Sequence, residues 1–253
     1  MKVKYFDLKN KRVFVSGGGS GIGATIVEHF CEQQSEVYFI DINIKASKQL
    51  IEKIKKKRFR VPKFIECNVL EIQKLQNLIK DIISKKGPIH CLINSAANDD
   101  RHSTEQVDEK YWENRMGINL KHYFFAAQSV VKGMKKIKSG SIVNLSSVSW
   151  VLGEGDKVIY ETAKSAVIGL TRSFAQEFGK FNIRTNSVIP GSIATERQIK
   201  NWLTPKYKKL ILDSQAIKRQ LKPDDVARLV LFLSSDQSSG CTKQSFVVDG
   251  GIT

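Results

Sequence analysis

A tyrosine and a lysine four residues apart stand out as a pair that could transfer a proton. Tyr160 and Lys164 are spaced i, i+4, so on a helix they share one face and lie about one turn apart. An isolated tyrosine has a pKa of ~10 and is a poor base at neutral pH. A lysine ammonium beside it stabilises the phenolate and lowers that pKa. The pair predicts a general base, although the same spacing is common between unrelated surface residues.

A serine hydroxyl precedes this pair by thirteen residues. Ser147 follows the segment 142–145, in which three of the four residues are apolar, as is typical of a buried strand, so its side chain should lie where that strand ends. A hydroxyl at this position could hydrogen-bond a substrate oxygen. The neighbouring Ser146 could serve the same purpose, and the spacing to Tyr160 favours Ser147.

A glycine-rich turn near the N-terminus indicates a phosphate-binding loop. The strand Arg12–Ser16 ends at Gly17, and a helical pattern runs from Ile22 to Gln34. Gly17 permits a sharp turn, Gly21 lets the backbone approach a pyrophosphate, and Gly23 lets the helix pack closely. The N–H groups at the start of the helix favour phosphate oxygens. Glycines alone are weak evidence, but their place between a strand and a helix favours a dinucleotide site.

An aspartate at the end of the second predicted strand indicates which dinucleotide binds. Asp41 lies eighteen residues after Gly23, where a carboxylate accepts hydrogen bonds from the ribose hydroxyls of NAD and repels the 2′-phosphate of NADP. The alternative is an ordinary turn aspartate. No arginine stands at 42 or 43, and the loop has the neutral Ser20, so the sequence favours NAD.

Strand and helix patterns alternate along the whole chain, which predicts a parallel sheet covered by helices on both faces. The expected fold class is α/β, a single doubly wound, Rossmann-like sheet of about seven strands that forms one NAD-binding domain over residues 1–253. Two further helices should begin near Thr204-Pro205 and at Asp224, which follows Pro223. The predicted strands are Arg12–Ser16, Glu36–Asp41, Lys63–Cys67, His90–Asn94, Ser141–Leu145, Ile183–Ile189 and Ser245–Val248.

Composition excludes several other classes of protein. The hydrophobic fraction is 41%, which supports a folded core, and no apolar run approaches the ~20 residues of a membrane span. The N-terminal residues lack a secretory signal, so we expect a cytoplasmic protein without a membrane partner. Four scattered cysteines and four histidines match no metal site.

The formal net charge of +16 could attract nucleic acid. Its densest run, Lys53 to Arg60, falls where a surface helix should end, a position that favours cations. No nucleic-acid-binding motif accompanies this run, and the aromatic residues do not form a stacking platform. We therefore expect a solvated basic surface and no nucleic-acid partner.

The order and spacing of these motifs resemble the short-chain dehydrogenase/reductase family over essentially the whole chain. The resemblance also covers the segment Asn94–Ala97, the lone Asn119 and the pair Pro190-Gly191, and it ends at residues 248–251. It implies a catalytic tetrad of Asn119, Ser147, Tyr160 and Lys164. In that tetrad Asn119 would hold a helix kink and a water that relays the proton, and Lys164 would also bind the nicotinamide ribose.

The same resemblance implies a cofactor site and a homotetramer. The sequence departs from the family at Asn68, where aspartate is usual, and at Ala97, where glycine is usual. The Asn68 amide oxygen could still accept from the adenine, and the Ala97 methyl could require a small backbone adjustment. The implied cofactor contacts are Gly17, Ser20, Gly21, Ile22, Gly23, Asp41, Ile42, Asn68, Val69, Asn94, Ala96, Tyr160, Lys164, Pro190, Gly191, Ile193 and Thr195.

Finer motifs resemble the bacterial NAD-dependent aldose 1-dehydrogenases, above all the D-xylose type. They include residues 98–102, 149–153 and 195–198. Amide, carboxylate and guanidinium groups suit sugar hydroxyls, and an indole ring can stack on a pyranose. Residues 99–102 could instead form a solvated loop with internal ion pairs. The predicted substrate contacts are Asn98, Asp99, Arg101, Ser147, Trp150 and Tyr160.

The resulting hypothesis is an NAD-dependent oxidoreductase that removes hydride from C1 of a cyclic pentose, hexose or 6-deoxyhexose and yields an aldonolactone. One alternative is a reductase of ketones such as 3-oxoacyl carrier protein, which the basic surface would suit and Asp41 disfavours. Another is a non-catalytic protein that binds NAD or nucleic acid, which the complete tetrad disfavours.

Overall fold

Within residues 3–253, seven parallel strands form one sheet in the order β3-β2-β1-β4-β5-β6-β7. The computed structural model describes residues 3–253. The predicted α/β class and the doubly wound sheet are confirmed, and the order of the strands reverses between β1 and β4. The strands are β1 (Arg12–Ser16), β2 (Glu36–Asp41), β3 (Lys63–Glu66), β4 (Cys91–Asn94), β5 (Gly140–Leu145), β6 (Ile183–Pro190) and β7 (Ser245–Val248).

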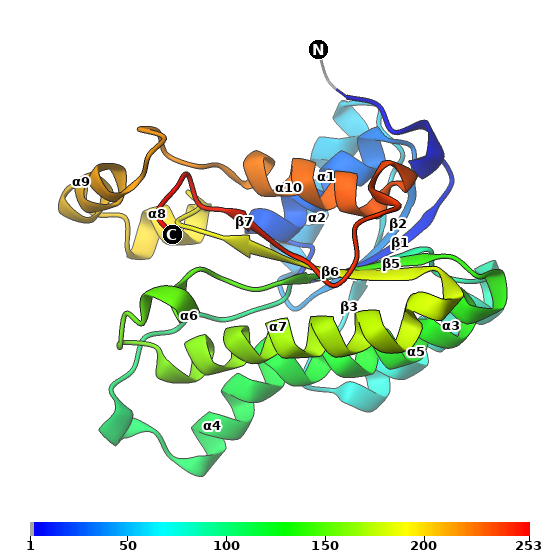
Figure 1. Ribbon diagram of the computed structural model, residues 1–253. Coiled ribbons are helices and arrows are strands. Elements are labelled where there is room, and N and C mark those ends of the chain that lie inside the picture. The colour runs from blue at the N-terminus through cyan, green and yellow to red at the C-terminus, as the bar shows by residue number, and fades with distance from the viewer. Residues whose placement is uncertain (1–2) are drawn as a thin grey trace.

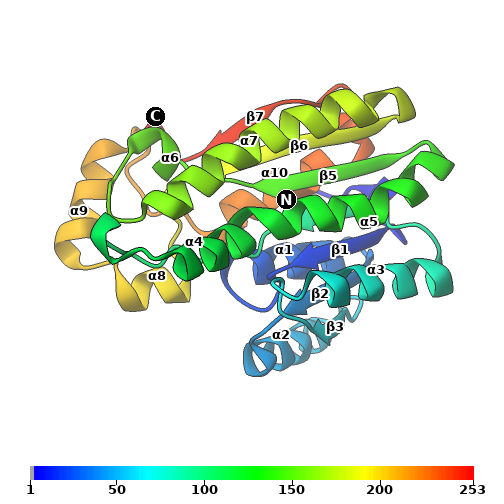
Figure 2. The same ribbon diagram turned by 90° about the horizontal axis from the view of Figure 1, so that it is seen from below.

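In the described part of the chain, six longer helices cover the two faces of the sheet (Figure 1). One face carries α1 (Gly21–Glu32), α2 (Ile44–Lys56) and α10 (Pro223–Ser234), and the other carries α3 (Ile72–Lys86), α5 (His122–Ile137) and α7 (Val158–Phe178). The shorter helices gather at one end of the sheet, on the left of both views (Figures 1 and 2). They are α4 (Glu109–Met116), α6 (Ser149–Leu152), α8 (Glu196–Asn201) and α9 (Pro205–Ser214).

Alternate residues of each central strand enter two separate cores. Val13 and Val15 pack with α1, α2 and α10, whereas Phe14 between them packs with α3, α5 and α7. Because successive side chains of a strand point to opposite faces, a sheet covered on both sides needs apolar residues at every position. This requirement explains the nearly continuous apolar runs in the sequence.

Four predicted strands differ from the structure by one residue at one end. β3 ends at Glu66 rather than Cys67, and β4 begins at Cys91 rather than His90, because pairing at strand ends is incomplete. β5 begins one residue early, at Gly140. β6 continues to Pro190, which lacks an N–H group but whose carbonyl accepts from the Val148 N–H at 3.0 Å.

The predicted helix starts are confirmed at three places. α1 runs over Gly21–Glu32, close to the predicted 22–34. The Thr204 hydroxyl caps α9 by accepting from the Tyr207 N–H at 3.2 Å, and Pro205 occupies the first turn. Pro223 likewise occupies the first turn of α10.

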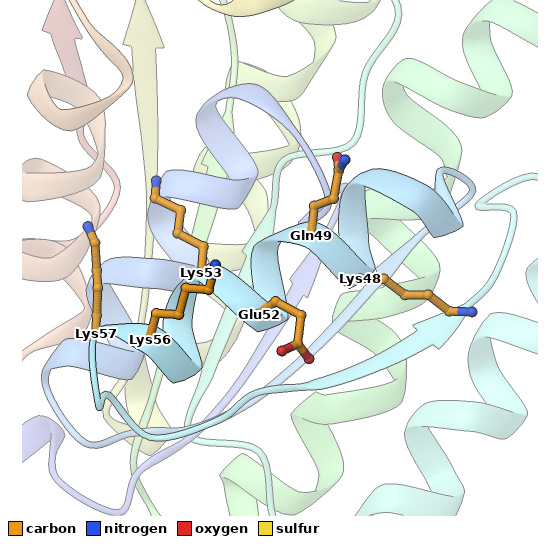
Figure 3. A pocket seen from close by; sticks show the side chains of 6 residues that line it. All are labelled: Lys48, Gln49, Glu52, Lys53, Lys56 and Lys57. Carbon is orange, nitrogen blue, oxygen red and sulfur yellow. The ribbon is translucent and has the colours of Figure 1, made fainter.

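The basic run Lys53–Arg60 lies at the end of α2, as expected (Figure 3). Lys53 and Lys57 extend to the same side of the helix and both pair with Glu28 on α1. A surface hollow beside them contains none of the candidate site residues. Glu28 therefore neutralises part of the run within the fold. Within residues 3–253, no helix combines the length and the apolar character needed to cross a membrane.

Candidate active site

The candidate residues converge on the carboxyl edge of the sheet, where ligands of doubly wound folds bind. Ser147 follows β5, Gly17 follows β1, and Asp41 ends β2, while Tyr160 and Lys164 reach this edge from α7. In the part of the chain that the structure describes, no cluster of three or more His, Cys, Asp or Glu side chains is arranged to hold a metal.

The hydroxyl of Ser147 is oriented by a neighbour that the sequence did not single out. Ser149 donates to Ser147 Oγ from its hydroxyl at 2.9 Å and from its N–H at 3.3 Å. With these two bonds accepted, the proton of Ser147 is left to donate to Tyr160 or to a substrate oxygen. Ser146 is buried and donates to the Lys164 carbonyl at 2.7 Å, so it holds α7 and is not available to a substrate.

Lys164 lies beneath Tyr160 in a fully enclosed position. Its side chain is 1% exposed, and its Nζ lies 5.5 Å from the centre of the Tyr160 ring. The ammonium donates to the Leu145 carbonyl at 2.8 Å and to the Tyr123 hydroxyl at 3.0 Å. Burial lowers the pKa of Lys164 to about 7, and the negative charge of Asp99 acts in the opposite direction.

The environment of Tyr160 opposes formation of its phenolate. Burial raises the pKa of Tyr160, and the charge of Asp99 raises it further, whereas the hydrogen bond with Ser147 lowers it. Tyr160 therefore needs nearby positive charge to stabilise its phenolate if it is to act as a base. The charge of Arg197 lowers the pKa of Tyr160, and the ammonium of Lys164 lies close enough to the ring to stabilise the phenolate as well.

Asn119 lies in a π-helical turn, Gly117–Lys121, between α4 and α5. Such a turn is a local widening of a helix, and it provides the irregularity that the resemblance implied. The amide of Asn119 makes two hydrogen bonds with the backbone of Asn98: its oxygen accepts from the N–H at 2.8 Å, and its nitrogen donates to the carbonyl at 3.0 Å. Asn119 thereby fixes the loop that follows β4.

Asp99 is held in place by two residues of α8. Arg197 Nη2 lies 3.2 Å from one carboxylate oxygen, and Gln198 Nε2 donates to the other at 2.7 Å. Arg197 also binds Asp100 at 2.6 Å and the Asn98 amide oxygen at 3.2 Å. Asp99 is thus anchored in a polar network while its charge acts on both Tyr160 and Lys164.

The guanidinium of Arg101 is engaged within the protein. It pairs with Asp156 and lies over the ring of Trp202, 4.6 Å from the ring centre. The Asp100 and Arg101 contacts match the internal ion pairs that the sequence offered as an alternative. Trp150, on α6, has a buried indole nitrogen that finds no hydrogen-bond acceptor among residues 3–253.

The glycine loop leaves no space for side chains at four of its positions, Gly17, Gly18, Gly19 and Gly23. Gly17 has φ of +67°, and a Cβ there would lie 2.6 Å from the Ala96 Cα. A Cβ on Gly19 would lie 2.8 Å from the Asp41 carboxyl carbon, and one on Gly23 only 2.0 Å from the Gly17 carbonyl oxygen. We call this closely packed turn, residues 17–23, the glycine cradle. Ser20 precedes α1, and its side chain makes no capping hydrogen bond.

We expect Gly23→Ala to destabilise the protein by about 1–3 kcal/mol, because the added methyl displaces the loop carbonyl. The measurement is the midpoint of urea-induced unfolding. The matched control is Gly179→Ala, where the added Cβ meets nothing within 4 Å and the backbone is helical. Equal stability of the two variants would contradict this account of the loop.

Asp41 is positioned against this cradle. One carboxylate oxygen accepts from the Gly19 N–H at 2.8 Å, and the other accepts from the Asn43 N–H at 2.8 Å. Each oxygen keeps a lone pair for a further donor. The carboxylate is therefore fixed beside the loop and remains able to accept from two neighbouring hydroxyls.

The remaining predicted cofactor residues surround the same edge, at different depths. Asn68 accepts from the Leu70 N–H at 3.0 Å through the oxygen that we expected to face the adenine. Asn94 is fully buried and donates to Asn144 at 2.9 Å, so its side chain lies beneath the site. Ala97 is not among the residues with positive φ, so its methyl requires no unusual backbone conformation.

Other members of the predicted set shape the edge through the backbone. Gly191 lies so close to Asp249 that a Cβ added to Gly191 would be 2.7 Å from the Cα of Asp249. Thr195 caps α8 by accepting from the Gln198 N–H at 3.2 Å, and Ile193 is buried in the core. Ile42 is 69% exposed, whereas Val69 is buried. The set is completed by Ala96, which lies next to Gly17, by Ile22 in the first turn of α1, and by Pro190 at the end of β6.

Three contacts of the site were not predicted from the sequence. Ser149 orients Ser147, Tyr123 binds Lys164, and the pair Arg197 and Gln198 holds Asp99. Each joins segments that are close only after folding, except Ser149, whose offset of two residues from Ser147 was visible. A hydroxyl two residues after a candidate serine is a signal that could have been weighed.

Named proteins resemble this chain along nearly its full length. The protein named "probable galactose dehydrogenase" of Rhizobium meliloti (strain 1021) is 40% identical over 246 residues, covering 97% of this chain and 96% of that protein. D-xylose 1-dehydrogenase of Caulobacter vibrioides is also 40% identical, over 98% of this chain and 97% of that enzyme. A 3-oxoacyl-[acyl-carrier-protein] reductase of Chlamydia pneumoniae is 32% identical, over 97% of this chain and 98% of that enzyme.

The fold has solved counterparts as well. The crystal structure of 3-oxoacyl-[acyl-carrier protein] reductase from Brucella melitensis superposes with a TM-score of 0.89 at 25% identity, covering 100% of this chain and 98% of that one. A family model described as enoyl-(acyl carrier protein) reductase matches residues 17–253. The match begins at the first glycine of the cradle and includes all the candidate site residues.

Proposed function

Because this chain belongs to the short-chain dehydrogenase/reductase family, it is an oxidoreductase that acts on CH–OH groups, and we propose that it is an NAD-dependent aldose 1-dehydrogenase. It would oxidise C1 of a cyclic pentose, hexose or 6-deoxyhexose to an aldonolactone. The observation that carries this proposal is the placement of Asp99, a carboxylate held by Arg197 and Gln198 close enough to Tyr160 to affect its pKa.

The polar groups around Asp99 suit a substrate with several hydroxyl groups. Ionised and amide side chains in the loop after β4 offer acceptors and donors to a sugar, and they would be a costly lining for an acyl chain. The names of the relatives that are 40% identical, galactose and D-xylose dehydrogenases, support the same substrate class. The reductases that act on acyl carrier proteins are less similar, at 32%.

In the proposed reaction Tyr160 removes the proton of the C1 hydroxyl. Ser147 donates a hydrogen bond to the same oxygen, and Lys164 stabilises the phenolate with its positive charge. NAD, when bound, supplies nicotinamide C4 as the acceptor of the hydride. The glycine cradle, the start of α1 and the Asp41 carboxylate are the groups that would hold the pyrophosphate and the adenosine ribose.

The test is the formation of NADH from NAD, measured at 340 nm with a panel of pentoses, hexoses, 6-deoxyhexoses and simple secondary alcohols. We expect one or a few aldoses to be oxidised with NAD and much more slowly with NADP. Turnover of secondary alcohols alone, or of no alcohol, would contradict the sugar assignment.

We expect Asp99→Asn to lower kcat/KM for the sugar by about 10- to 100-fold, since hydrogen bonds to a charged acceptor contribute about 1.5–3 kcal/mol. KM for NAD should change little. The matched control is Asp100→Asn, which removes the neighbouring carboxylate that also binds Arg197. An equal loss in both variants would assign the effect to the ion-pair network and not to contact between Asp99 and the sugar.

A second candidate function is reduction of a ketone on an acyl carrier protein. The description of the matching family model and the net charge of +16, which would attract an acidic carrier, favour it. Its test is the oxidation of NADPH with a 3-oxoacyl thioester. Rapid NADPH oxidation together with failure on every sugar would establish this candidate and refute the first.

Residues 1–253 would act as one NAD-binding domain, and the chain would assemble as a homotetramer. Large apolar side chains are exposed on the neighbouring helices α4, α5 and α7: Trp112, Phe124 and Val158 are 40%, 42% and 38% exposed. Apolar residues in such positions suit contacts between subunits. Light scattering coupled to size-exclusion chromatography measures the assembly directly, and a monomer would contradict it.

A further inference from the structure

A second tyrosine lies against the buried lysine of the site. Tyr123 is on α5, and its side chain is 0% exposed. Its hydroxyl oxygen accepts from Lys164 Nζ at 3.0 Å, and its proton is donated to the Leu145 carbonyl at 3.0 Å. Tyr123 is four residues after Asn119 and has no place in the tetrad.

The two acceptors determine how the ammonium is directed. A lysine ammonium has three N–H groups. One is donated to the Leu145 carbonyl at 2.8 Å, and a second is donated to Tyr123. The third is the one left for Tyr160, whose ring centre is 5.5 Å from Nζ, and for the ribose of a bound dinucleotide.

We propose that Tyr123 is a positioning residue for the reaction: its hydroxyl keeps Lys164 charged and directs the free N–H of the ammonium towards Tyr160. This inference rests on the proposed function, because it assigns a role within the same proton transfer. It concerns the hydroxyl group alone. Packing of the ring against His122, at 4.5 Å between ring centres, would be equally available to phenylalanine.

A buried ammonium is unfavourable unless acceptors replace the water that it loses. The pKa of Lys164, lowered to about 7, reflects that loss. Without the Tyr123 oxygen, the Leu145 carbonyl would be the one acceptor left to the ammonium among the described residues, and the pKa of Lys164 would fall further. A smaller fraction of the enzyme would then carry the positive charge that Tyr160 requires.

A neutral acceptor suits this place better than a carboxylate. The titratable groups that face Lys164 are Tyr160 on the same helix, Asp99 from the loop after β4, and His122 and Tyr123 from α5. His122 is neutral because burial lowers its pKa to about 3. A second negative charge beside Asp99 would stabilise the ammonium but would also oppose the phenolate. The Tyr123 hydroxyl avoids that conflict.

The experiment compares Tyr123→Phe with the matched control Tyr38→Phe. Tyr38 is another buried tyrosine, on β2, and its hydroxyl donates to Glu36 at 2.6 Å. In protein labelled with carbon-13 at lysine Cε and measured without cofactor, we expect Lys164 to titrate near pH 7, and about one pH unit lower in Tyr123→Phe. The Lys164 signal is assigned with Lys164→Arg.

The kinetic measurement is the pH profile of kcat for sugar oxidation. Because a less charged Lys164 raises the pKa of the base, the acid limb of the profile should move to higher pH in Tyr123→Phe. At pH 7 we expect kcat to fall about 5-fold, as the charged fraction of Lys164 does, with a smaller change in KM for NAD. Tyr38→Phe should leave both the titration and the profile in place.

An unchanged Lys164 titration overturns the inference, and so does a shifted titration with an unchanged acid limb. If Tyr123 had a purely structural role, Tyr123→Phe would lower the midpoint of unfolding but would change neither the Lys164 titration nor the acid limb of the pH profile. If the wild type oxidises no sugar, the proposed function fails by itself, and the titration of the cofactor-free protein still decides whether Tyr123 acts on Lys164.

Discussion

Tyr160→Phe should lower kcat for sugar oxidation by about 10²- to 10⁴-fold, the range associated with loss of a general base. The variant retains the ring that lies above Lys164 and loses only the oxygen that takes the proton. We therefore expect it to fold and to bind NAD with nearly unchanged affinity. Turnover is followed at 340 nm, and NAD binding is measured by calorimetry without sugar.

The control for this variant is again Tyr38→Phe, because the Tyr38 hydroxyl is buried and bonded but lies outside the site. It should retain the activity of the wild type. Activity of Tyr160→Phe within about 10-fold of the wild type would rule out Tyr160 as the base. Loss of NAD binding in that variant would instead indicate that the substitution disturbs the site as a whole.

Asp41→Asn should weaken the preference for NAD over NADP by about 10- to 100-fold, measured as the ratio of kcat/KM for the two cofactors. Hydrogen bonds to a charged acceptor contribute about 1.5–3 kcal/mol, and the amide offers one oxygen where the carboxylate offers two. The amide also removes the charge that opposes a 2′-phosphate. KM for NAD should rise, and KM for NADP should fall.

Glu36→Gln is the matched control for Asp41→Asn, because Glu36 is the acidic residue at the other end of β2. Its carboxylate binds Tyr38 and lies 3.9 Å from Arg12, away from the glycine cradle. It should not alter the cofactor ratio. A wild type that uses both cofactors equally well would show that Asp41 does not select between them.

Much of the fold follows from local sequence patterns. β1, β2 and β7 begin and end where their apolar residues predict, and Pro205 and Pro223 mark the helix starts. These features depend on short-range chemistry: burial on two faces, and the fixed φ of proline. The strand ends that differ by one residue depend on pairing between distant segments, which a single sequence does not reveal.

Local sequence patterns predict less of the site than of the fold. The π-helical turn around Asn119 arises in a segment whose residues would also suit an ordinary helix. The contact between Tyr123 and Lys164 joins residues 41 positions apart, and the pairing of Asp99 with Arg197 joins the loop after β4 to α8. Residue types suggested what chemistry was available, but the folded chain determines which of these groups meet.

The two hydrogen bonds between the Asn119 amide and the backbone of Asn98 have a consequence for how the enzyme could diversify. A side-chain amide that bonds both the N–H and the carbonyl of one residue takes the place of a neighbouring strand. The loop after β4 is thereby anchored at its base, independently of the side chains beyond it. Substitutions at residues 100–102 should leave these two bonds in place, whereas a substitution of Asp99 would also change the charge that acts on Tyr160 and Lys164.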